Sequence, residues 1–509
     1  MNRSRPQGRF FHNPFEIQAG SVYLRPNFAR KENRTMRLIT LISLTLFNGI
    51  ALAQNIPPAP VRETATPDAR LPDSAEHAVE DKKQAQKQQA QVMHVTEAEL
   101  LADPALLANA LDSAIINGDA DAVAMLLPIY KKLPADKQDK MLLRFGEAMK
   151  ARADGDLNLA IARLREMIAE DPSLQPVRLH LAMALLADHQ DEAARGQLEK
   201  LRSDNLPEDI RNIVNQALET LRERRSWTFN ASGYYRHDRN INDAPRQRER
   251  QVGNGKWTFP APKNAHGVHL DVSAERRIPI KNGFYGQVEA GVVTDWFWDA
   301  HKYDDFRLRA GAGVGWQNSR WDISLTPFIQ RRIYASKGYS TNLGVDGNVS
   351  YWITPRWRIS SAVQGMHKHH DSRKWLNGNQ YYGSLNLLFA PNARQYWFAG
   401  ANAMRSQALD SSDAFKRYGL SAGWGQEWGW GMSTRLSGNI AYRTYDGKDF
   451  FGIERKDHEY GATLSLWNRN FYFWGITPRL TFTWDKTRSN HFYYDNHNAD
   501  VYLEFSKSF

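Results

Sequence analysis

The sequence predicts two structural classes in one chain: tetratricopeptide-like α-helical repeats, followed by a transmembrane β-barrel of about 14 antiparallel strands. Three observations lead to this fold class. Helical segments align with one another at a spacing of 34 residues. From about residue 226 the hydropathy pattern has a period of two, which is typical of strands. Between these strands, short and long polar breakers alternate, as the turns and loops of a barrel do.

The first 92 residues contain no folded element that the pattern can identify. The run "MRLITLISLTLFNGIALAQN" begins at Met36, places an Arg after the Met, and reaches a small-x-small motif at Ala53. This pattern is typical of a secretory signal peptide and is too short to span a bilayer. We therefore expect 1–53 to be an upstream segment and signal peptide, with Met36 as the true start. Residues 54–92, rich in Pro, Ala, Gln and charge, predict a disordered linker.

Residues 93–225 predict a periplasmic tetratricopeptide-like helical domain. "DLNLAIARLREMIAEDP" and "HQDEAARGQLEKLRSDNLP" align, so that Ala148 matches Ala182 and Ala160 matches Ala194. Small residues at such positions let two helices cross closely, and stacked helix pairs build a concave surface that binds peptides. An earlier pair, "PALLANALDSAIINGDADAVAMLLPIYKKLP", fits the repeat more loosely. The alternative is a generic helical bundle.

Residues 226–509 predict the barrel. "VHLDVSAER" alternates Val, Leu, Val and Ala with His, Asp, Ser and Glu, and "FRLRAGAGVGW" repeats the scheme. Short breakers near 281, 318, 354, 391, 429 and 468 alternate with longer ones at 240–266, 299–304, 335–340, 368–378, 405–414, 444–457 and 486–497. Six turns and seven loops connect fourteen strands. A soluble β-sandwich is the alternative, and the apolar outward face of nearly every strand argues against it.

The last twelve residues, "NADVYLEFSKSF", read as the strand that closes this barrel. Phe505 and Phe509 lie on its apolar face. Unpaired backbone groups are costly in lipid, so the last strand must pair with the first. We expect this contact near Trp227.

The opposite face of the strands is polar and carries both signs of charge. The lumen-lining candidates are Arg307, Arg309, Arg332, Arg358, Arg435, Arg479, Glu275, Glu289 and Asp322. About fourteen strands leave room for a conduit. The chain has 0 Cys, which excludes disulfides, Cys-based metal sites and acylation of a mature N-terminal Cys.

No motif for catalysis, cofactor binding or metal binding stands out. G-x-S-x-G, H-E-x-x-H and P-loop patterns are missing from the sequence. His367, His369 and His370 cluster in "GMHKHHDSRKW", but the absence of Cys and of a well-spaced carboxylate favours a solvated surface loop. The net charge of +10 is spread along the chain, so we expect no nucleic acid partner. We predict a protein that is not an enzyme.

The entry to the barrel carries the most specific signal. In "SWTFNASGYYRHDRNINDAP", Trp227 starts a strand that ends in Asp238, Asn240, Asn242 and Pro245. Together with the linker, the helical repeats and about fourteen strands, it resembles the surface lipoprotein assembly modulator (Slam) family of Neisseria and related Gram-negative bacteria. The resemblance covers about 95 to 509.

This resemblance implies an outer-membrane translocon that delivers lipoproteins to the cell surface. Its implied clients are transferrin-, lactoferrin-, haemoglobin- or factor H-binding lipoproteins, and the barrel would lie in outer-membrane lipid. Periplasmic chaperones and the barrel assembly machinery are further candidate partners. The alternatives are an exopolysaccharide exporter, which also joins helical repeats to a barrel, and a nutrient porin, which would need no helical domain.

Overall fold

The computed structural model describes residues 96–204, 206–245, 248–252, 255–392, 394–474 and 476–508. The predicted signal peptide and linker lie outside the described residues, and so does Phe509. The chain divides into two compact units, with the break after Val177. The boundary predicted at 225/226 differs from this break. It lies where the helices give way to strands, since the last helix ends at Glu223 and the first strand begins at Trp227.

Among the described residues, eight α-helices precede the strands. The first unit holds α2 (Glu97–Ala102), α3 (Pro104–Ile116), α4 (Ala120–Tyr130), the 3₁₀ turn η1 (Ala135–Lys137), α5 (Lys140–Ala153) and α6 (Leu157–Glu170); α7 (Gln175–Ala187) crosses the break, and α8 (Asp191–Arg202) and α9 (Glu208–Glu223) follow in the second unit. An Asp precedes each of α3 to α6 and accepts backbone N–H groups of the first turn. Such caps satisfy donors that the helix itself leaves unpaired, which fixes where each helix begins.

The predicted 34-residue repeat is confirmed, and it is visible in the burial of the matched alanines and in the turns between the helices. Ala148 and Ala160 of α5 and α6, and Ala182 and Ala194 of α7 and α8, are all 0% exposed. Between α5 and α6 the chain turns at Gly155, whose φ is +81°. Thirty-four residues later, between α7 and α8, His189 takes the same left-handed conformation with a φ of +56°. Glycine adopts this conformation freely, whereas a side chain makes it unfavourable.

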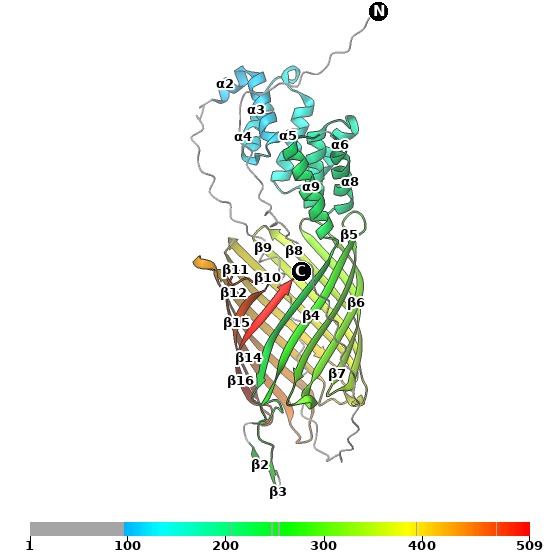
Figure 1. Ribbon diagram of the computed structural model, residues 1–509, viewed down its shortest axis with the longest axis vertical. Coiled ribbons are helices and arrows are strands. Elements are labelled where there is room, and N and C mark those ends of the chain that lie inside the picture. Colours follow the sequence, from blue (N-terminus) through cyan, green and yellow to red (C-terminus); the bar gives the residue numbers. More distant parts are fainter. Residues whose placement is uncertain are drawn as a thin grey trace, which may run out of the picture. The chain divides into compact units, whose positions relative to one another are not determined.

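Fourteen antiparallel strands close into a barrel in which β1 lies beside β16 (Figure 1). They are β1 (Trp227–Asp238), β4 (Ala265–Pro279), β5 (Phe284–Phe297), β6 (Asp305–Gln317), β7 (Trp321–Tyr334), β8 (Lys337–Thr354), β9 (Trp357–His370), β10 (Gly378–Asn392), β11 (Gln395–Ser406), β12 (Phe415–Glu427), β13 (Met432–Lys448), β14 (Glu454–Asn468), β15 (Thr477–Ser489) and β16 (Asn496–Ser508). A separate hairpin joins β2 (Glu249–Val252) to β3 (Gly255–Thr258), and the connections contain the 3₁₀ turns η2 (His301–Tyr303), η3 (Lys374–Leu376) and η4 (Gly429–Gly431). The predicted fold class and strand number are confirmed.

The two faces of the barrel wall differ in polarity as the period of two predicts. Apolar side chains such as Val314, Leu343 and Val363 are 58–60% exposed on the outside. On the inside, glycines alternate with them, and a Cβ placed on Gly425 would lie 2.2 Å from the ring of Tyr396. Glycine therefore lets an inward aromatic ring lie flat against the neighbouring strand.

Two predicted loops are much shorter than the sequence suggested. The loop expected at 335–340 is a tight turn at Ala335 and Ser336, whose φ values are +51° and +60°, and β8 begins directly after it. Two successive residues with positive φ make the hairpin turn that matches strand twist, and Asn-Gly is its usual sequence signal. Ala-Ser lacks that signal. The loop expected at 444–457 is likewise mostly strand, because β13 continues to Lys448 and β14 begins at Glu454.

The connections also give the barrel a direction. Short turns such as 318–320 and 355–356 lie at the end where β1 begins, and the long segment 239–264 lies at the end where β1 finishes. In outer-membrane barrels the short turns face the periplasm. The helices that lead into β1 are therefore periplasmic. Within the second unit, the carboxylate of Asp188 in the α7–α8 turn accepts a hydrogen bond from the backbone N–H of Ser319 at 3.3 Å.

Candidate functional site

The nine predicted lumen-lining side chains all lie on strand faces opposite to the exposed apolar side chains. Arg307 and Arg309 of β6, for example, alternate with Leu308, which is 40% exposed on the outside. The structure shows which acidic and aromatic partners these side chains have, information that the sequence did not contain.

Arg309 of β6 contacts side chains of three other strands near the middle of the wall. Its Nε and Nη2 donate to Oε1 of Glu289 on β5 at 3.1 and 3.0 Å, and Nη2 also donates to Asp346 on β8. The guanidinium lies 3.7 Å from the ring centroid of Phe328 on β7. Charge-assisted bonds of this kind fix both partners in place, so Arg309 gives the inner wall a rigid polar surface.

A second network lies toward the periplasmic end. Arg277 donates from Nη1 to Oδ2 of Asp322 at 2.9 Å and from Nε to Oε1 of Glu275 at 3.2 Å. The hydroxyl of Tyr285 donates to the other oxygen of Asp322 at 2.6 Å. Sequence reasoning named Glu275 and Asp322 but missed Arg277, because the alternation of polar residues does not reveal partners three strands apart. Arg358 donates to the hydroxyl of Ser350 at 2.9 Å.

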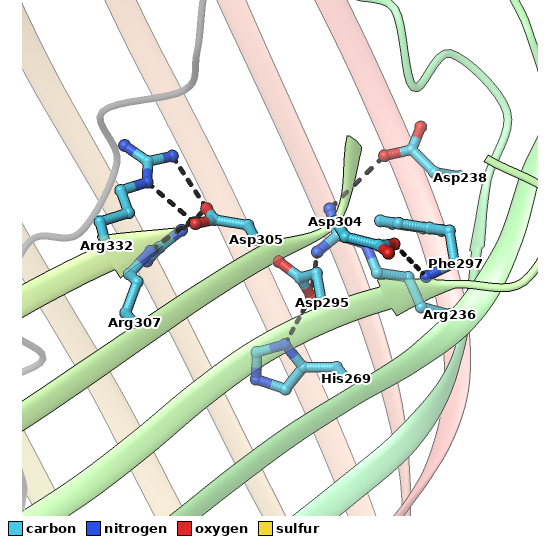
Figure 2. Close-up of polar contacts among 9 residues, drawn as sticks. All are labelled: Arg236, Asp238, His269, Asp295, Phe297, Asp304, Asp305, Arg307 and Arg332. Atoms are coloured by element: carbon cyan, nitrogen blue, oxygen red, sulfur yellow. Dashed lines mark hydrogen bonds and ion pairs between the residues drawn. The ribbon is translucent and has the colours of Figure 1, made fainter. Parts of the chain in front are cut away.

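A third network lies toward the extracellular end, where Figure 2 shows Arg307 and Arg332 converging on Asp305. Both guanidinium groups approach its carboxylate at 2.8 Å.

Beside it, Asp295 has two partners, Arg236 at 2.5 Å and Nδ1 of His269 at 2.7 Å (Figure 2). In the next connection, Asp304 accepts the backbone N–H of Phe297 at 2.8 Å, which ties the loop to the end of β5.

On the opposite wall the arginines have different partners. Arg417 and Arg443 both reach Glu459 at 2.8 Å. The predicted Arg435 lies 5.6 Å from the ring centroid of Phe398, and Arg479 lies 4.6 Å from that of Trp467. Arginine stacks well on aromatic faces, so these two side chains are held by rings. The inner wall as a whole is polar, mixed in charge and extensively paired.

The motif at the end of β1 builds a folded extracellular loop. Asn240 donates from its backbone N–H to Asp238 at 2.9 Å, and its amide group exchanges hydrogen bonds of 3.0 and 2.9 Å with the backbone of Ala244. Asn242 donates to Ala261 and accepts from the backbone of Lys263 in the returning segment. Pro245 is buried. The side-chain amides of both asparagines thus bond to backbone N–H and C=O groups as a neighbouring stretch of backbone would, which explains their spacing.

The seam that closes the barrel is its shortest strand pairing. Among the described residues, β1 pairs with β16 only over Asn230–Tyr234 and Glu504–Ser508, whereas it pairs with β4 along its whole length from Trp227 to Asp238. The side chains of β1 also make more contacts on the β4 side than on the β16 side. Arg236 forms an ion pair with Asp295 of β5, beyond β4. Toward β16, the rings of Tyr234 and Tyr502 stack at 4.0 Å. Phe505, 41% exposed, lies opposite Gly233.

The three clustered histidines do not occupy a loop. His367, His369 and His370 are the end of β9, and the predicted loop 368–378 is therefore shorter, beginning after His370. Nδ1 of His367 contacts the amide oxygen of Asn379 at 2.8 Å, while His370 is 2% exposed. No group of three His, Cys, Asp or Glu side chains within the part of the chain that the structure describes could hold a metal ion.

Two histidines outside the strands have lowered pKa values. Burial lowers the pKa of His189 in the α7–α8 turn, and the nearby Arg224 lowers it further. Burial also lowers the pKa of His491 in the last extracellular loop. Both imidazoles are therefore held neutral to lower pH than a free histidine.

No helix in the described ranges is long and apolar enough to cross a membrane.

A fourteen-stranded barrel with an apolar outside, a polar inside and a periplasmic helical segment defines an integral outer-membrane protein. A family model described as "Surface lipoprotein assembly modifier" matches residues 227–509, and one described as "Surface lipoprotein assembly modifier, N-terminal TPR repeats" matches 93–198. The chain belongs to the surface lipoprotein assembly modifier family, as its first strand and helical repeats predicted.

Curated relatives share most of the chain. "Surface lipoprotein assembly modifier 1" of Haemophilus influenzae is 36% identical over 425 residues, which covers 82% of this chain and 87% of the relative. "Surface lipoprotein assembly modifier" of Pasteurella multocida is 34% identical over 442 residues, covering 82% and 86%. "Surface lipoprotein assembly modifier 1" of Neisseria meningitidis serogroup B is 34% identical over 492 residues, covering 95% and 98%.

Proposed function

We propose that this chain is an outer-membrane translocon that delivers lipoproteins to the cell surface. The observation that supports it most is the joining, in a member of this family, of a helical repeat segment to a barrel with a continuous polar inner wall. Transport, not catalysis, is the role that this architecture suits. The client lipoproteins in this proposal are those that bind transferrin, lactoferrin, haemoglobin or factor H.

The helices supply the receiving surface in this scheme. Helix pairs with small residues at their crossings form a concave face, and such faces bind extended peptide segments. An unfolded or partly folded client would be held there on the periplasmic side. Periplasmic chaperones would keep the client unfolded before this step, and the barrel assembly machinery would insert the barrel itself.

The inner wall supplies the path. A client segment contains both charged and neutral residues, and a wall whose charges are already paired, as Arg309 is with Glu289, offers polar contacts without a strong preference for one sign. A passage for a charged polysaccharide would favour one sign of charge along its length. The mixed, internally paired wall therefore supports a protein client.

The seam supplies the exit for the lipid anchor in this proposal. A lipoprotein must place acyl chains in the outer leaflet while its polypeptide crosses in water, and this requires an opening in the wall. The stretch between β1 and β16 has the least backbone pairing to break, five residue pairs ending at Tyr234. Nε2 of His237, just beyond the paired stretch, is buried without a hydrogen-bond partner among the described residues. Both features favour opening from the extracellular side.

The experiment compares a strain that lacks the gene with the same strain carrying the intact gene. Surface proteins on intact cells are labelled with a membrane-impermeant reagent, and each candidate lipoprotein is quantified in the labelled and total fractions. The proposal predicts that at least one lipoprotein is lost from the surface while its total amount persists. Unchanged lipoprotein display combined with lost surface polysaccharide would instead favour an exporter.

A further inference from the structure

A hollow of about 680 Å³ lies in the outer wall of the barrel, across β10 to β14. Its floor is made by Gly383, Ala401 and Ala403, which occupy outward positions where neighbouring strands carry large side chains. A Cβ added to Gly383 would meet no atom within 4 Å, so the floor is open above this residue. A volume of this size is typical of sites for small ligands, roughly 300–1,000 Å³.

The walls of the hollow are apolar and aromatic. In the sheet register Ala403 lies opposite Tyr418, which lies opposite Tyr442, and Ala401 lies opposite Leu420. The rings of Tyr442 and His458 lie 4.8 Å apart at the far side. The hollow therefore suits, in shape and chemistry, an acyl chain that lies against the outer wall.

A positive charge lies at the extracellular end of the hollow. Arg405 and Lys416 are partners in the sheet, one outward position beyond Ala403 and Tyr418, which is roughly 7 Å along the strands. Arg405 is engaged by Asp446 through two hydrogen bonds, one of 2.9 Å. Lys416 is also exposed and interacts electrostatically with the same Asp446. The three groups together leave one uncompensated positive charge.

We infer that this hollow binds a phosphorylated glycolipid of the outer leaflet, with an acyl chain over Gly383 and a phosphate against Lys416 and Arg405. An uncharged lipid would fill the apolar part but would leave the excess positive charge of this group uncompensated. Lysine and arginine both bind phosphate through charge-assisted hydrogen bonds. These two residues lie at the extracellular ends of β11 and β12, where the outward face changes from apolar to charged, as the outside of a barrel does at the edge of its apolar band. This inference stands independently of the proposed transport function.

The test measures binding of purified lipid A to the intact protein in mild detergent by native mass spectrometry. Gly383→Leu places a side chain in the hollow without a clash of its Cβ with the protein, and Lys416→Gln removes the positive charge of residue 416. Lys416→Gln is expected to bind intact lipid A roughly tenfold more weakly, the loss of about one charge-assisted contact, and Gly383→Leu should weaken binding by a similar factor because its side chain displaces the acyl chain. Matched controls are Gly286→Leu, at an outward glycine of β5 whose added Cβ also meets nothing within 4 Å, and Lys337→Gln at the start of β8. The controls should bind like the parent protein.

A second arm uses lipid A without phosphates. Gly383→Leu should still weaken its binding, while Lys416→Gln should not change it. Heat-modifiable migration on gels identifies folded barrels, so that only folded protein is compared. The inference is overturned if Gly383→Leu and Gly286→Leu behave alike, or if Lys416→Gln binds intact lipid A as the parent does. Equal binding of a neutral diacylglyceryl lipopeptide would also overturn it, because the hollow would then fit the lipid of a client.

Discussion

Locking the seam between β1 and β16 should stop lipoprotein display without changing the folded barrel. Ser232 and Ser506 are partners across this seam and share its inner face. Directly opposed residues in antiparallel strands have Cβ atoms about 4.5–5.5 Å apart, near the range that a disulfide needs. The chain has 0 Cys, so Ser232→Cys with Ser506→Cys creates one defined cross-link. Opening the seam then requires reduction.

The structure sets the size of the effect. The seam has five residue pairs and the β1–β4 pairing has twelve. With about one backbone hydrogen bond a pair and a net ~0.5–1.5 kcal/mol each where water reaches the opened edge, opening the seam costs about 2.5–7.5 kcal/mol, against about 6–18 kcal/mol for β1–β4. Backbone groups left unpaired in lipid cost several kcal/mol each, which raises both figures and keeps the seam the cheaper of the two. A client that binds the opened state can supply the smaller amount. A covalent cross-link raises the cost beyond what any client contact supplies.

The assay is surface labelling of a client lipoprotein in cells that carry the double variant, before and after a membrane-permeant reductant. Display should be lost when the cross-link is oxidised and restored on reduction. The control pairs Ser232→Cys with Asp271→Cys, which lie opposite each other across β1 and β4. Its oxidised form should display lipoprotein normally. Normal display with the β1–β16 cross-link fully formed would refute a lateral exit at this seam.

Four further predictions concern other parts of the chain. His189→Gly should slow hydrogen exchange in the α7–α8 turn of the full protein, because it removes a left-handed side chain that costs roughly 1–2 kcal/mol; faster exchange would show that the histidine stabilises the turn. In the parent, the lowered pKa of His189 means that the folded turn binds fewer protons than the unfolded turn. The protection of the turn against hydrogen exchange should therefore fall as the pH drops below about 6.5. The variant His189→Gln should remove this pH dependence. Gly425→Leu should reduce the amount of heat-modifiable barrel, because its Cβ would lie 2.2 Å from the Tyr396 ring, and an unchanged amount would mean that the ring moves aside freely. Deleting 93–225 should leave a barrel that inserts but displays little lipoprotein, and full display would exclude the helices from client capture.

The regular parts of the fold were predictable from the sequence because they follow simple periods. In β4, Val268, Leu270 and Val272 alternate with polar residues, and only one placement of such a strand puts the apolar face in lipid. The repeat was equally clear, since Ala148 and Ala182, which match at a spacing of 34 residues, are both fully buried. Local pattern and global packing demand the same residues at these positions.

The details that the sequence did not reveal depend on contacts between distant strands. Arg277 finds Asp322 forty-five residues away, and that contact exists because the register places β4 and β7 close together on the inner wall. Hydropathy alternation assigns a residue to a face but not to a partner. The Ala335-Ser336 turn was missed for another reason: neither residue favours positive φ, so its conformation is imposed by the paired strands on either side. The short seam is likewise a property of register and not of composition.

Whether a client passes through the barrel interior can be tested by site-specific cross-linking. A photoreactive amino acid is placed at Ser421 or at Ala422, neighbours on β12 that face the interior and the lipid respectively. A client lipoprotein is arrested during export in intact cells by fusion to a tightly folding domain, and the cells are irradiated. Passage through the interior predicts client cross-links from position 421 and none, beyond background, from position 422. Cross-links from 422 alone, or from neither position while display proceeds, would contradict passage through the barrel.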